Sequence, residues 1–422
     1  MVDTHTMSQI QKIRNTLAAR DFRLLLLSTF PGVIGEVADF IAQGWLVLSL
    51  TQDSALWVGI VSGARGAGHI GFAILGGVLA DRFPRKLVLV NLRFLRAVTL
   101  AILAILILTG NVELWHVLII AFIQGSADGL MAPSFNGLIY DTVGPTKLMN
   151  AIAYVLAAFH ITWAIGSVLT GHLISSSGIW VAYALASVAF LISMVFLKIM
   201  QTSNTGQVGE ESILLNLIQG FKYVAKSTPL RALLLLSVLT EAFGFSYLIM
   251  LPVIAKTVLQ VGPTGLGYLT AAGGIGSLIG TAVVAALSDY RNKWKLLTIG
   301  TLSAGVSILL FATSPWYELS LVLVGFIGFS LVSYDAAINT LLQTISIDEM
   351  RGRVLGLYGM TWGFTPAGGF AAGSIANITG APVAIGLGAT IILTYTLAVI
   401  ARMNGSQTRA QETLAGTDKE ST

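Results

Sequence analysis

Residues 77–109 read GVLADRFPRKLVLVNLRFLRAVTLAILAILILT, a short basic loop followed by a long apolar run. The run begins at Leu87 and is long enough to cross a bilayer as one helix, which takes about 20 mostly apolar residues. Three bases immediately precede it, namely Arg82, Arg85 and Lys86. Because Lys and Arg concentrate in the cytoplasmic loops of membrane proteins, the stretch predicts a transmembrane helix that begins at the cytoplasmic face.

The composition of the whole chain favours the same interpretation. Of 422 residues, 55% are hydrophobic and only 10% are charged, whereas a soluble domain has about 25% charged residues. The mean hydropathy is +0.81, a value typical of membrane proteins. The chain has no cysteine, which excludes disulfides, thiol catalysis and zinc–thiolate sites. The net charge of +4 arises from bases in short loops, so we expect no nucleic-acid partner.

Apolar runs of spanning length recur along the chain, six on each side of a polar stretch at 201–212. They lie near residues 24–50, 56–80, 87–109, 114–140, 150–174, 179–200, 230–256, 265–288, 295–313, 318–346, 354–378 and 382–402. Lys and Arg occupy alternate loops, and Lys256 is the one base that borders the other side. We therefore expect a multi-pass protein of a bacterial cytoplasmic (inner) membrane, with both termini cytoplasmic.

The polar stretch divides the chain into two similar parts. We expect an N-terminal six-helix bundle at 1–200, a cytoplasmic linker with an amphipathic helix at 201–228, a second six-helix bundle at 229–404 and a disordered cytoplasmic tail at 405–422. Arg23 and Arg231 precede the first span of each part, and Asp81 and Asp289 follow the second span with the same offset. Transporters built from parallel repeats hold their substrate where the repeats meet, near the bilayer midplane.

The loop Gly77–Lys86 resembles the signature of the major facilitator superfamily, Gly-x-x-x-Asp-Arg/Lys-x-Gly-Arg-Arg/Lys. Pro84 stands where that signature has glycine, and the second-half copy around Asp289 keeps little beyond its acid and bases. Other stretches resemble the branch that contains enterobactin exporters and macrolide efflux proteins, among them Arg20-Asp21-Phe22-Arg23, Asp128-Gly129 and Arg351-Gly352-Arg353-Val354. The resemblance implies an all-α membrane protein of twelve transmembrane helices in two pseudo-symmetric six-helix bundles.

In that family the acid that matches Asp81 contacts the start of the eleventh helix and nearby bases, where the helix dipole and charge-assisted hydrogen bonds stabilise it. This contact joins the two halves on the cytoplasmic side. The resemblance thus implies a conformational switch formed by Gly77, Asp81, Arg82, Arg85, Lys86, Asp289, Arg351 and Arg353. Alternatively, Arg82, Arg85 and Lys86 serve only to anchor their loop in the cytoplasm.

Ionisable residues inside spans are costly, so they are candidates for proton coupling or for the cavity lining. They are Glu36, Asp39, Arg65, Asp128, Glu241 and Asp335. Burial favours the neutral form of a carboxylic acid, and we take Glu36 as the first candidate for proton binding. In the alternative, Arg65 only neutralises Glu36 or Asp39 and holds the first two spans together. Arg93 and Arg96 are expected to extend toward the lipid headgroups.

Two further patterns concern packing and the cavity. Glycines four residues apart let helices in lipid approach closely, and they occur as Gly59/Gly63, Gly276/Gly280 and Gly369/Gly373. Aromatic residues on the expected cavity helices favour a sizeable, partly apolar substrate. These aromatics are Trp45, Phe243, Phe245, Tyr247, Tyr334 and Trp362.

These features favour a secondary transporter that exports amphipathic small molecules, such as drugs or siderophore-like compounds, by proton antiport and alternating access. A metabolite importer or facilitator has the same architecture, and an intramembrane lipid-handling protein is an alternative of another class. We find no Gly-x-Ser-x-Gly, His-Glu-x-x-His or Walker A sequence, so we expect neither an enzyme nor an ATP-driven pump. We expect no cofactor and no metal, and a monomer whose partners are the substrate, protons and lipid.

Overall fold

The computed structural model describes residues 16–202, 213–287, 290 and 292–417, whose regular structure is helical. Helices suit a chain in lipid, because every backbone hydrogen bond is then satisfied within one segment. The first half contains a short helical turn, η1 (Pro145–Lys147), and six long helices. These helices are α2 (Arg20–Leu50), α3 (Ala55–Arg82), α4 (Arg85–Leu108), α5 (Leu114–Val143), α6 (Leu148–Ser177) and α7 (Ile179–Ile199).

The second half follows α8 (Ile213–Lys226) and begins with an unbroken span that contains two π-helical segments. This span consists of α9 (Thr228–Leu239), η2 (Thr240–Gly244), α10 (Ser246–Val253) and η3 (Ile254–Val258). The remaining helices are α11 (Pro263–Ala286), α12 (Lys293–Thr313), α13 (Tyr317–Ile345), α14 (Asp348–Thr361), α15 (Phe364–Thr379) and α16 (Ala381–Thr417).

Within the described residues, ten helices are long and apolar enough to cross a membrane by themselves, five in each half. Helix α3 is the sixth crossing of the first half, and it bends by 46° between Ala73 and Leu75. Helices α14 and α15, separated by Trp362 and Gly363, lie where the sequence predicts the sixth crossing of the second half. The described residues thus contain ten candidate spans, or eleven when the bent α3 is counted, where the sequence predicts twelve.

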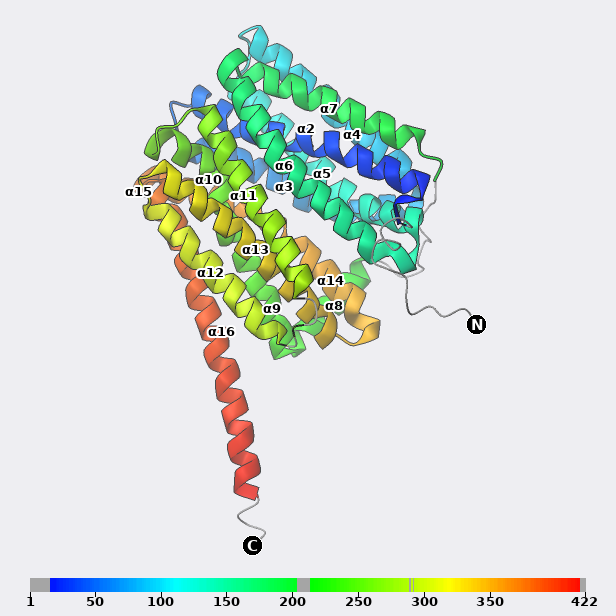
Figure 1. The fold of residues 1–422 in the computed structure, drawn as a ribbon, viewed down its shortest axis with the longest axis vertical. Coiled ribbons are helices and arrows are strands. Elements are labelled where there is room, and N and C mark those ends of the chain that lie inside the picture. Colours follow the sequence, from blue (N-terminus) through cyan, green and yellow to red (C-terminus); the bar gives the residue numbers. More distant parts are fainter. Residues whose placement is uncertain (1–15, 203–212, 288–289, 291, 418–422) are drawn as a thin grey trace.

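The helices form two bundles, which Figure 1 shows with the first half in blue to green and the second half in green to red. In the first half α7 packs against α2 and α4, and α3 packs against α5. In the second half α13 packs against α11 and α12, and α12 packs against α16. Two helix pairs join the halves, α3 with α15 and α6 with α11.

Glycines permit these joining contacts. A Cβ atom on Gly373 would lie 2.7 Å from the Cα of Gly59, and a Cβ on Gly171 would lie 3.1 Å from the Cα of Gly267. The predicted close packing at Gly59 and Gly373 is confirmed, and it occurs between the halves. The pair Gly276/Gly280 also packs closely, but within the second half, against Gly325 and Phe329 of α13.

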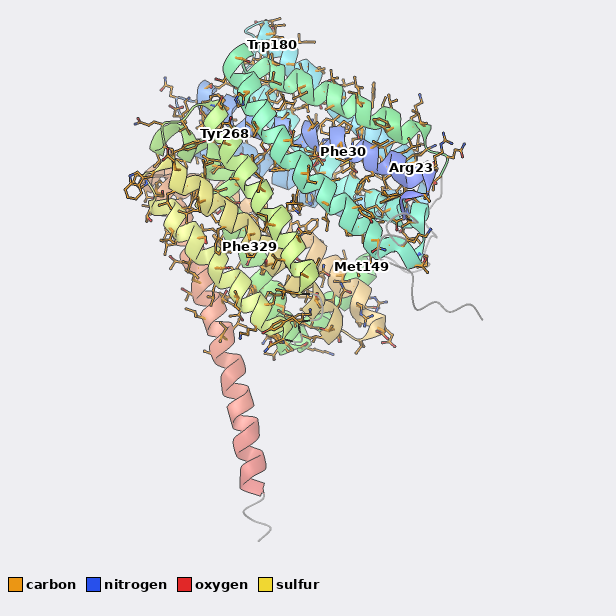
Figure 2. The ribbon with its side chains drawn as sticks, in the orientation of Figure 1. Arg23, Phe30, Met149, Trp180, Tyr268 and Phe329 are labelled. Atoms are coloured by element: carbon orange, nitrogen blue, oxygen red, sulfur yellow. The ribbon has the colours of Figure 1, made fainter. Side chains whose placement is uncertain are left out.

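The halves touch mainly at one end. We call the end that carries Arg23 and Met149 the basic side, and Figure 2 shows both residues far from Trp180 on the opposite side. The glycine contacts that join the halves lie toward the opposite side, near the start of α3 and the start of α11. From there α6 and α11 diverge toward the basic side (Figure 1). The two bundles therefore separate toward the basic side.

An ion pair also joins the halves on the opposite side. Lys256 Nζ in η3 lies 2.5 Å from Asp53 Oδ1, in the turn between α2 and α3, and 5.5 Å from the ring centre of Trp45. Gln52 and Asp53 both have positive φ angles, of 53° and 64°, and the N–H of Asp53 donates to the carbonyl of Leu48. The turn thus positions the Asp53 carboxylate for its ion pair with Lys256.

Two segments differ from the expected domain plan. Helix α16 continues to Thr417, although the sequence analysis placed a disordered tail from residue 405. Residues 405–417 lack proline and include helix formers such as Ala, Gln, Arg, Glu and Leu, so nothing forces the helix to stop near 404. In α8, Val224 is buried and Gly220 packs on Arg353, whereas Phe221 is 68% exposed. The expected apolar face of α8 is therefore split between packing against α14 and exposure.

We expect the Asp53–Lys256 pair to stabilise the conformation in which the opposite side is closed. Exposed ion pairs contribute about 0–1 kcal/mol and a cation–π contact about 0.5–1 kcal/mol. Lys256→Met should therefore raise the population open on the opposite side several-fold. The measurement is the distance distribution between spin labels at Asn111→Cys and Thr313→Cys, for which the cysteine-free chain is a ready background.

A charge reversal provides the control for this prediction. Asp53→Lys combined with Lys256→Asp should return the distances toward those of the native chain, because the attraction is restored. Glu318→Gln removes an exposed acid on the same side and should have no effect. Unchanged distances in both Asp53→Asn and Lys256→Met would contradict the prediction.

Candidate transport site

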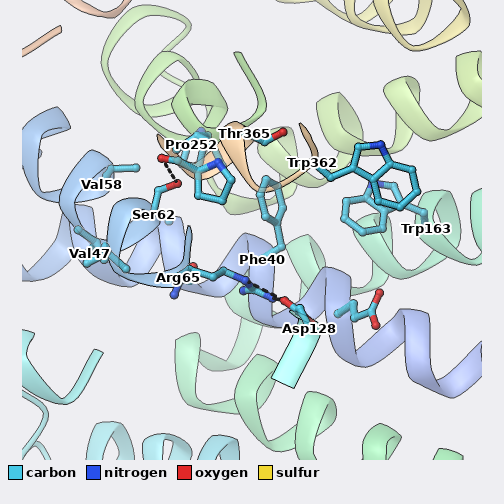
Figure 3. A pocket seen from close by; sticks show the side chains of 16 residues that line it. Phe40, Val47, Val58, Ser62, Arg65, Asp128, Trp163, Pro252, Trp362 and Thr365 are labelled. Atoms are coloured by element: carbon cyan, nitrogen blue, oxygen red, sulfur yellow. Dashed lines mark hydrogen bonds and ion pairs between the residues drawn. The ribbon is translucent and has the colours of Figure 1, made fainter. Parts of the chain in front are cut away.

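A cavity of about 310 Å³ lies between the two halves. The first half contributes side chains from α2, α3, α5 and α6, and the second half contributes from α10, α15 and the α14–α15 break. The lining residues are Glu36, Phe40, Gln43, Gly44, Val47, Val58, Val61, Ser62, Arg65, Asp128, Trp163, Ile249, Pro252, Trp362, Thr365 and Pro366. Figure 3 shows the Arg65–Asp128 pair and the rings of Phe40, Trp163 and Trp362 around this space.

Arg65 connects three helices of the first half. Its Nη1 donates to Asp39 Oδ2 at 2.8 Å and its Nη2 donates to Asp128 Oδ2 at 2.9 Å. Helices α3 and α5 approach closely enough for this because α5 has Gly125, where a Cβ would lie 1.8 Å from the carbonyl oxygen of Arg65. The sequence predicted Arg65 as a partner of Glu36 or Asp39, and the structure pairs it with Asp39 and adds Asp128.

Arg93 and Arg96 bring α4 into the same cluster. Arg96 Nη1 lies 2.8 Å from Asp128 Oδ1 and 3.3 Å from Glu36 Oε1, and Arg93 Nη1 lies 3.4 Å from Glu36 Oε1. Arg96 Nε donates to Gln124 Oε1 at 2.7 Å. We call Glu36, Asp39, Arg65, Arg93, Arg96 and Asp128 the first-half charge cluster.

The expectation that Arg93 and Arg96 extend toward headgroups is wrong. Their exposed fractions are 6% and 0%, and both guanidinium groups lie over the ring of Phe190, at 5.2 and 4.4 Å from its centre. A Cβ on Gly32 of α2 would lie 2.8 Å from Arg93 Nη2, so that glycine provides the room. These bases remain inside because carboxylates and an aromatic face there compensate their charge.

The second half has two acids without such compensation. Glu241 lies in η2, and its Oε2 accepts a hydrogen bond of 2.6 Å from Thr365 Oγ1. Asp335 on α13 accepts a hydrogen bond from the hydroxyl of Tyr358 on α14. Among the described residues neither acid forms an ion pair with a base. Neither acid is among the cavity-lining residues, and Thr365, which lines the cavity, connects Glu241 to it.

The π-helical segment around Glu241 is a local signal that the sequence alone did not provide. One extra residue in the turn changes the direction in which following side chains point, and such segments often occur at functional sites. Helix α15 approaches this segment very closely, because a Cβ on Gly368 would lie 1.6 Å from the carbonyl oxygen of Ala242. The close approach brings Thr365 within hydrogen-bond distance of Glu241.

Within the described residues, three bases of the expected conformational switch have partners other than Asp81. Arg85 pairs with Asp141 at 2.9 Å, Lys86 Nζ donates to the carbonyl of Met200 at 2.8 Å, and Arg351 pairs with Asp348 at 2.6 Å. Asp81 forms no ion pair within the described part of the chain. Gly77 and Arg82 lie in α3, and Arg353 Nη1 contacts Met350 Sδ at 3.3 Å. Asp289 lies outside the described residues.

The sequence did not predict three residues with a role here, namely Asp141 beside the basic loop and Phe40 and Trp163 in the cavity. Asp141 ends α5 beside the basic loop, and an acid at such an end was an available signal for a partner of Arg85. Among the predicted cavity aromatics only Trp362 lines the cavity, whereas Tyr247 and Tyr334 are 2% and 0% exposed in the interior of the second half. Phe40 and Trp163 line it instead, and hydropathy alone does not distinguish cavity-facing from lipid-facing aromatics.

Two six-helix bundles around a central cavity with buried charges define a membrane transporter of the major facilitator type. Solved structures agree on this fold. The nucleoside transporter NupG matches with a TM-score of 0.71 at 15% identity, covering 90% of this chain and 98% of that one. A bacterial homologue of the lysosomal transporter Spinster, in an inward-facing and unoccupied conformation, matches with a TM-score of 0.70 at 13% identity, covering 93% and 98%.

Sequence comparison gives the family. Residues 14–418 match the transmembrane secretion effector family, MFS_3, and the chain belongs to this family of transporters, which are not enzymes. It is 24% identical to the multidrug efflux pump Tap of Mycolicibacterium fortuitum over 85% of this chain and 89% of that protein. It is 25% identical to the enterobactin exporter EntS of Escherichia coli O1:K1 over 80% of each.

We expect the first-half charge cluster to be essential for folding. Removing one member of a buried ion pair leaves an uncompensated charge and costs about 3–5 kcal/mol. Arg96→Met should therefore lower the thermal unfolding temperature of the purified protein strongly, and Arg82→Met, which removes an exposed base of the same half, should not. Equal unfolding temperatures for the two variants would contradict a structural role for Arg96.

Proposed function

We propose that this chain is a secondary active exporter of amphipathic small molecules, driven by proton antiport through alternating access. The observation that carries the proposal is a cavity between the halves that combines aromatic and apolar walls with carboxylates and polar groups. Such a lining suits molecules with both apolar and polar parts. The names of the relatives, a multidrug efflux pump and an enterobactin exporter, support export and this substrate class.

The proposed orientation follows from the distribution of bases. The basic side faces the cytoplasm of a bacterial inner membrane, and both termini lie on that side. The halves are joined on the opposite side by the glycine contacts and the Asp53–Lys256 pair, so this conformation is open toward the cytoplasm. Arg351 pairs with Asp348 in this conformation, and we propose that Asp81 meets Arg351 and Arg353 when the cytoplasmic side closes.

For proton binding we propose Glu241, with Asp335 as its neighbour, in place of Glu36. Arg93 and Arg96 both contact Glu36, so these cations compensate the charge of its carboxylate. Glu241 and Asp335 have only hydroxyl donors beside them. An acid that lacks a nearby cation in a low-dielectric interior is the better candidate to take up and release a proton in each cycle.

The test is efflux measured in energised inverted vesicles with a panel of dyes and siderophore-like compounds. Native transport should stop when a proton uncoupler is added, because the gradient drives it. Glu241→Gln should lose uncoupler-sensitive transport but retain substrate exchange without a gradient, since the cavity is intact. Glu36→Gln removes a member of the first-half charge cluster, so it is compared at equal amounts of folded protein. That folded protein should keep its sensitivity to the uncoupler.

Three outcomes would contradict parts of this proposal. Transport that ignores the uncoupler would indicate a facilitator instead of an antiporter. Uptake by right-side-out vesicles along a ligand gradient alone would indicate an importer. Loss of uncoupler sensitivity in Glu36→Gln with normal behaviour of Glu241→Gln would return the proton site to the first half.

A further inference from the structure

The break between α14 and α15 has a local cause in the sequence Gly363-Phe364-Thr365-Pro366. Pro366 has no N–H to donate, and its ring collides with the carbonyl four residues earlier, that of Trp362. The backbone tightens instead, as the N–H of Gly363 donates to Met360 at 3.2 Å and that of Thr365 donates to Trp362 at 3.3 Å. We call residues 362–366 the hinge, and it borders the cavity through Trp362, Thr365 and Pro366.

The arm on the opposite side of the hinge, α15, is attached to α3 of the first half as well as to η2 of its own half. A Cβ on Gly66 of α3 would lie 2.5 Å from the Cβ of Pro366, and Ser62 Oγ donates to the carbonyl of Pro366 at 3.4 Å. Further along, Gly373 lies against Gly59. Helix α15 therefore belongs to the contact that closes the opposite side.

The arm on the basic side, α14, is attached to the second half instead. Tyr358 donates to Asp335 of α13, and Thr361 Oγ1 lies 2.7 Å from Ser237 Oγ of α9. Gly220 of α8 packs on Arg353. The hinge therefore lies where one transmembrane span passes from the joined part of the molecule to the separated part.

One acid holds each arm: the buried Glu241 holds α15, and the half-buried Asp335 holds α14. Glu241 accepts from Thr365, next to Pro366 on α15, and Asp335 accepts from Tyr358, on α14. Besides Tyr358, the titratable groups of the described residues that lie near each acid are the second acid and the phenol of Tyr334. The ionised carboxylate is a strong acceptor for both hydroxyls, whereas a protonated carboxyl is a weaker acceptor and gains a donor of its own.

We propose that Thr365 and Tyr358 are positioning residues that convert protonation of Glu241 and Asp335 into bending at the hinge. Loss of the negative charges weakens the hydroxyl contacts that fix the angle between α14 and α15. The basic-side arm then moves relative to the arm that is bound to α3, which changes the width of the cavity opening on the basic side. This inference rests on the proposed proton sites, and it adds the element through which they act.

Distances across the basic side test the proposal without any substrate. Spin labels at Met149→Cys, at the start of α6, and Glu349→Cys, on α14, report the separation of the halves, and both positions are exposed. On going from alkaline to mildly acidic pH, the native background should shift its ratio of open to closed populations by about fivefold, a typical coupling. Thr365→Val and Tyr358→Phe should each abolish most of this shift.

Conservative and matched variants distinguish the loss of a positioning hydroxyl from a general loss of structure. Thr365→Ser keeps a hydroxyl and should keep the shift. Thr379→Val removes a hydroxyl of α15 that bonds within its own helix, and Tyr140→Phe removes an exposed phenol, so both should behave like the native background. Thermal unfolding temperatures of Thr365→Val and Tyr358→Phe close to that of the native background show that both variants fold.

The possible failures can be distinguished. A native shift that survives in Thr365→Val and Tyr358→Phe overturns the role of these hydroxyls and leaves proton coupling intact. Absence of any native shift, together with uncoupler-sensitive transport, overturns the hinge proposal alone. Absence of the shift together with uncoupler-insensitive transport overturns the proposed antiport as well.

Discussion

Charge compensation inside an apolar bundle is the constraint on which the first half depends. Arg96 is fully buried, and it is tolerated there because Glu36, Asp128 and the ring of Phe190 surround its guanidinium. Arg65 extends the same network to Asp39. Three acids and three bases from α2, α3, α4 and α5 thus fix the rotation of four helices about their axes, since turning any one of them would leave a charge in lipid.

The second half accommodates its interior charged groups in a different way. Its two interior acids, the buried Glu241 and the half-buried Asp335, each accept a hydrogen bond from one hydroxyl, and no base pairs with them among the described residues. A salt-bridged network resists change, whereas an acid held by a single hydroxyl responds to the arrival of a proton. This asymmetry supports the proposal that the first half stays rigid during transport and that the second half contains the segment that moves.

The contact between the halves agrees with this division. Glycines on α3 and α15 allow backbone-to-backbone packing on the opposite side, and the partly exposed Asp53–Lys256 pair adds a modest stabilisation. Pro366 interrupts the same span near the cavity. A single chain segment therefore combines, in sequence order, the arm α14, the proposed hinge and the tight glycine contact of α15 with α3.

The sequence by itself determined the number and position of the spans and the family signature, because hydropathy, bases and turn residues act within one segment. It also identified the ionisable residues of the cavity region, since charges in apolar runs are conspicuous wherever they point. Only the tertiary structure decided their partners: Arg65 with Asp128, Arg85 with Asp141, and Arg93 and Arg96 turned inward. The reason is that the direction of a side chain around a helix axis depends on close approach by helices distant in sequence, such as α5 at Gly125 and α15 at Gly368, which no local pattern specifies.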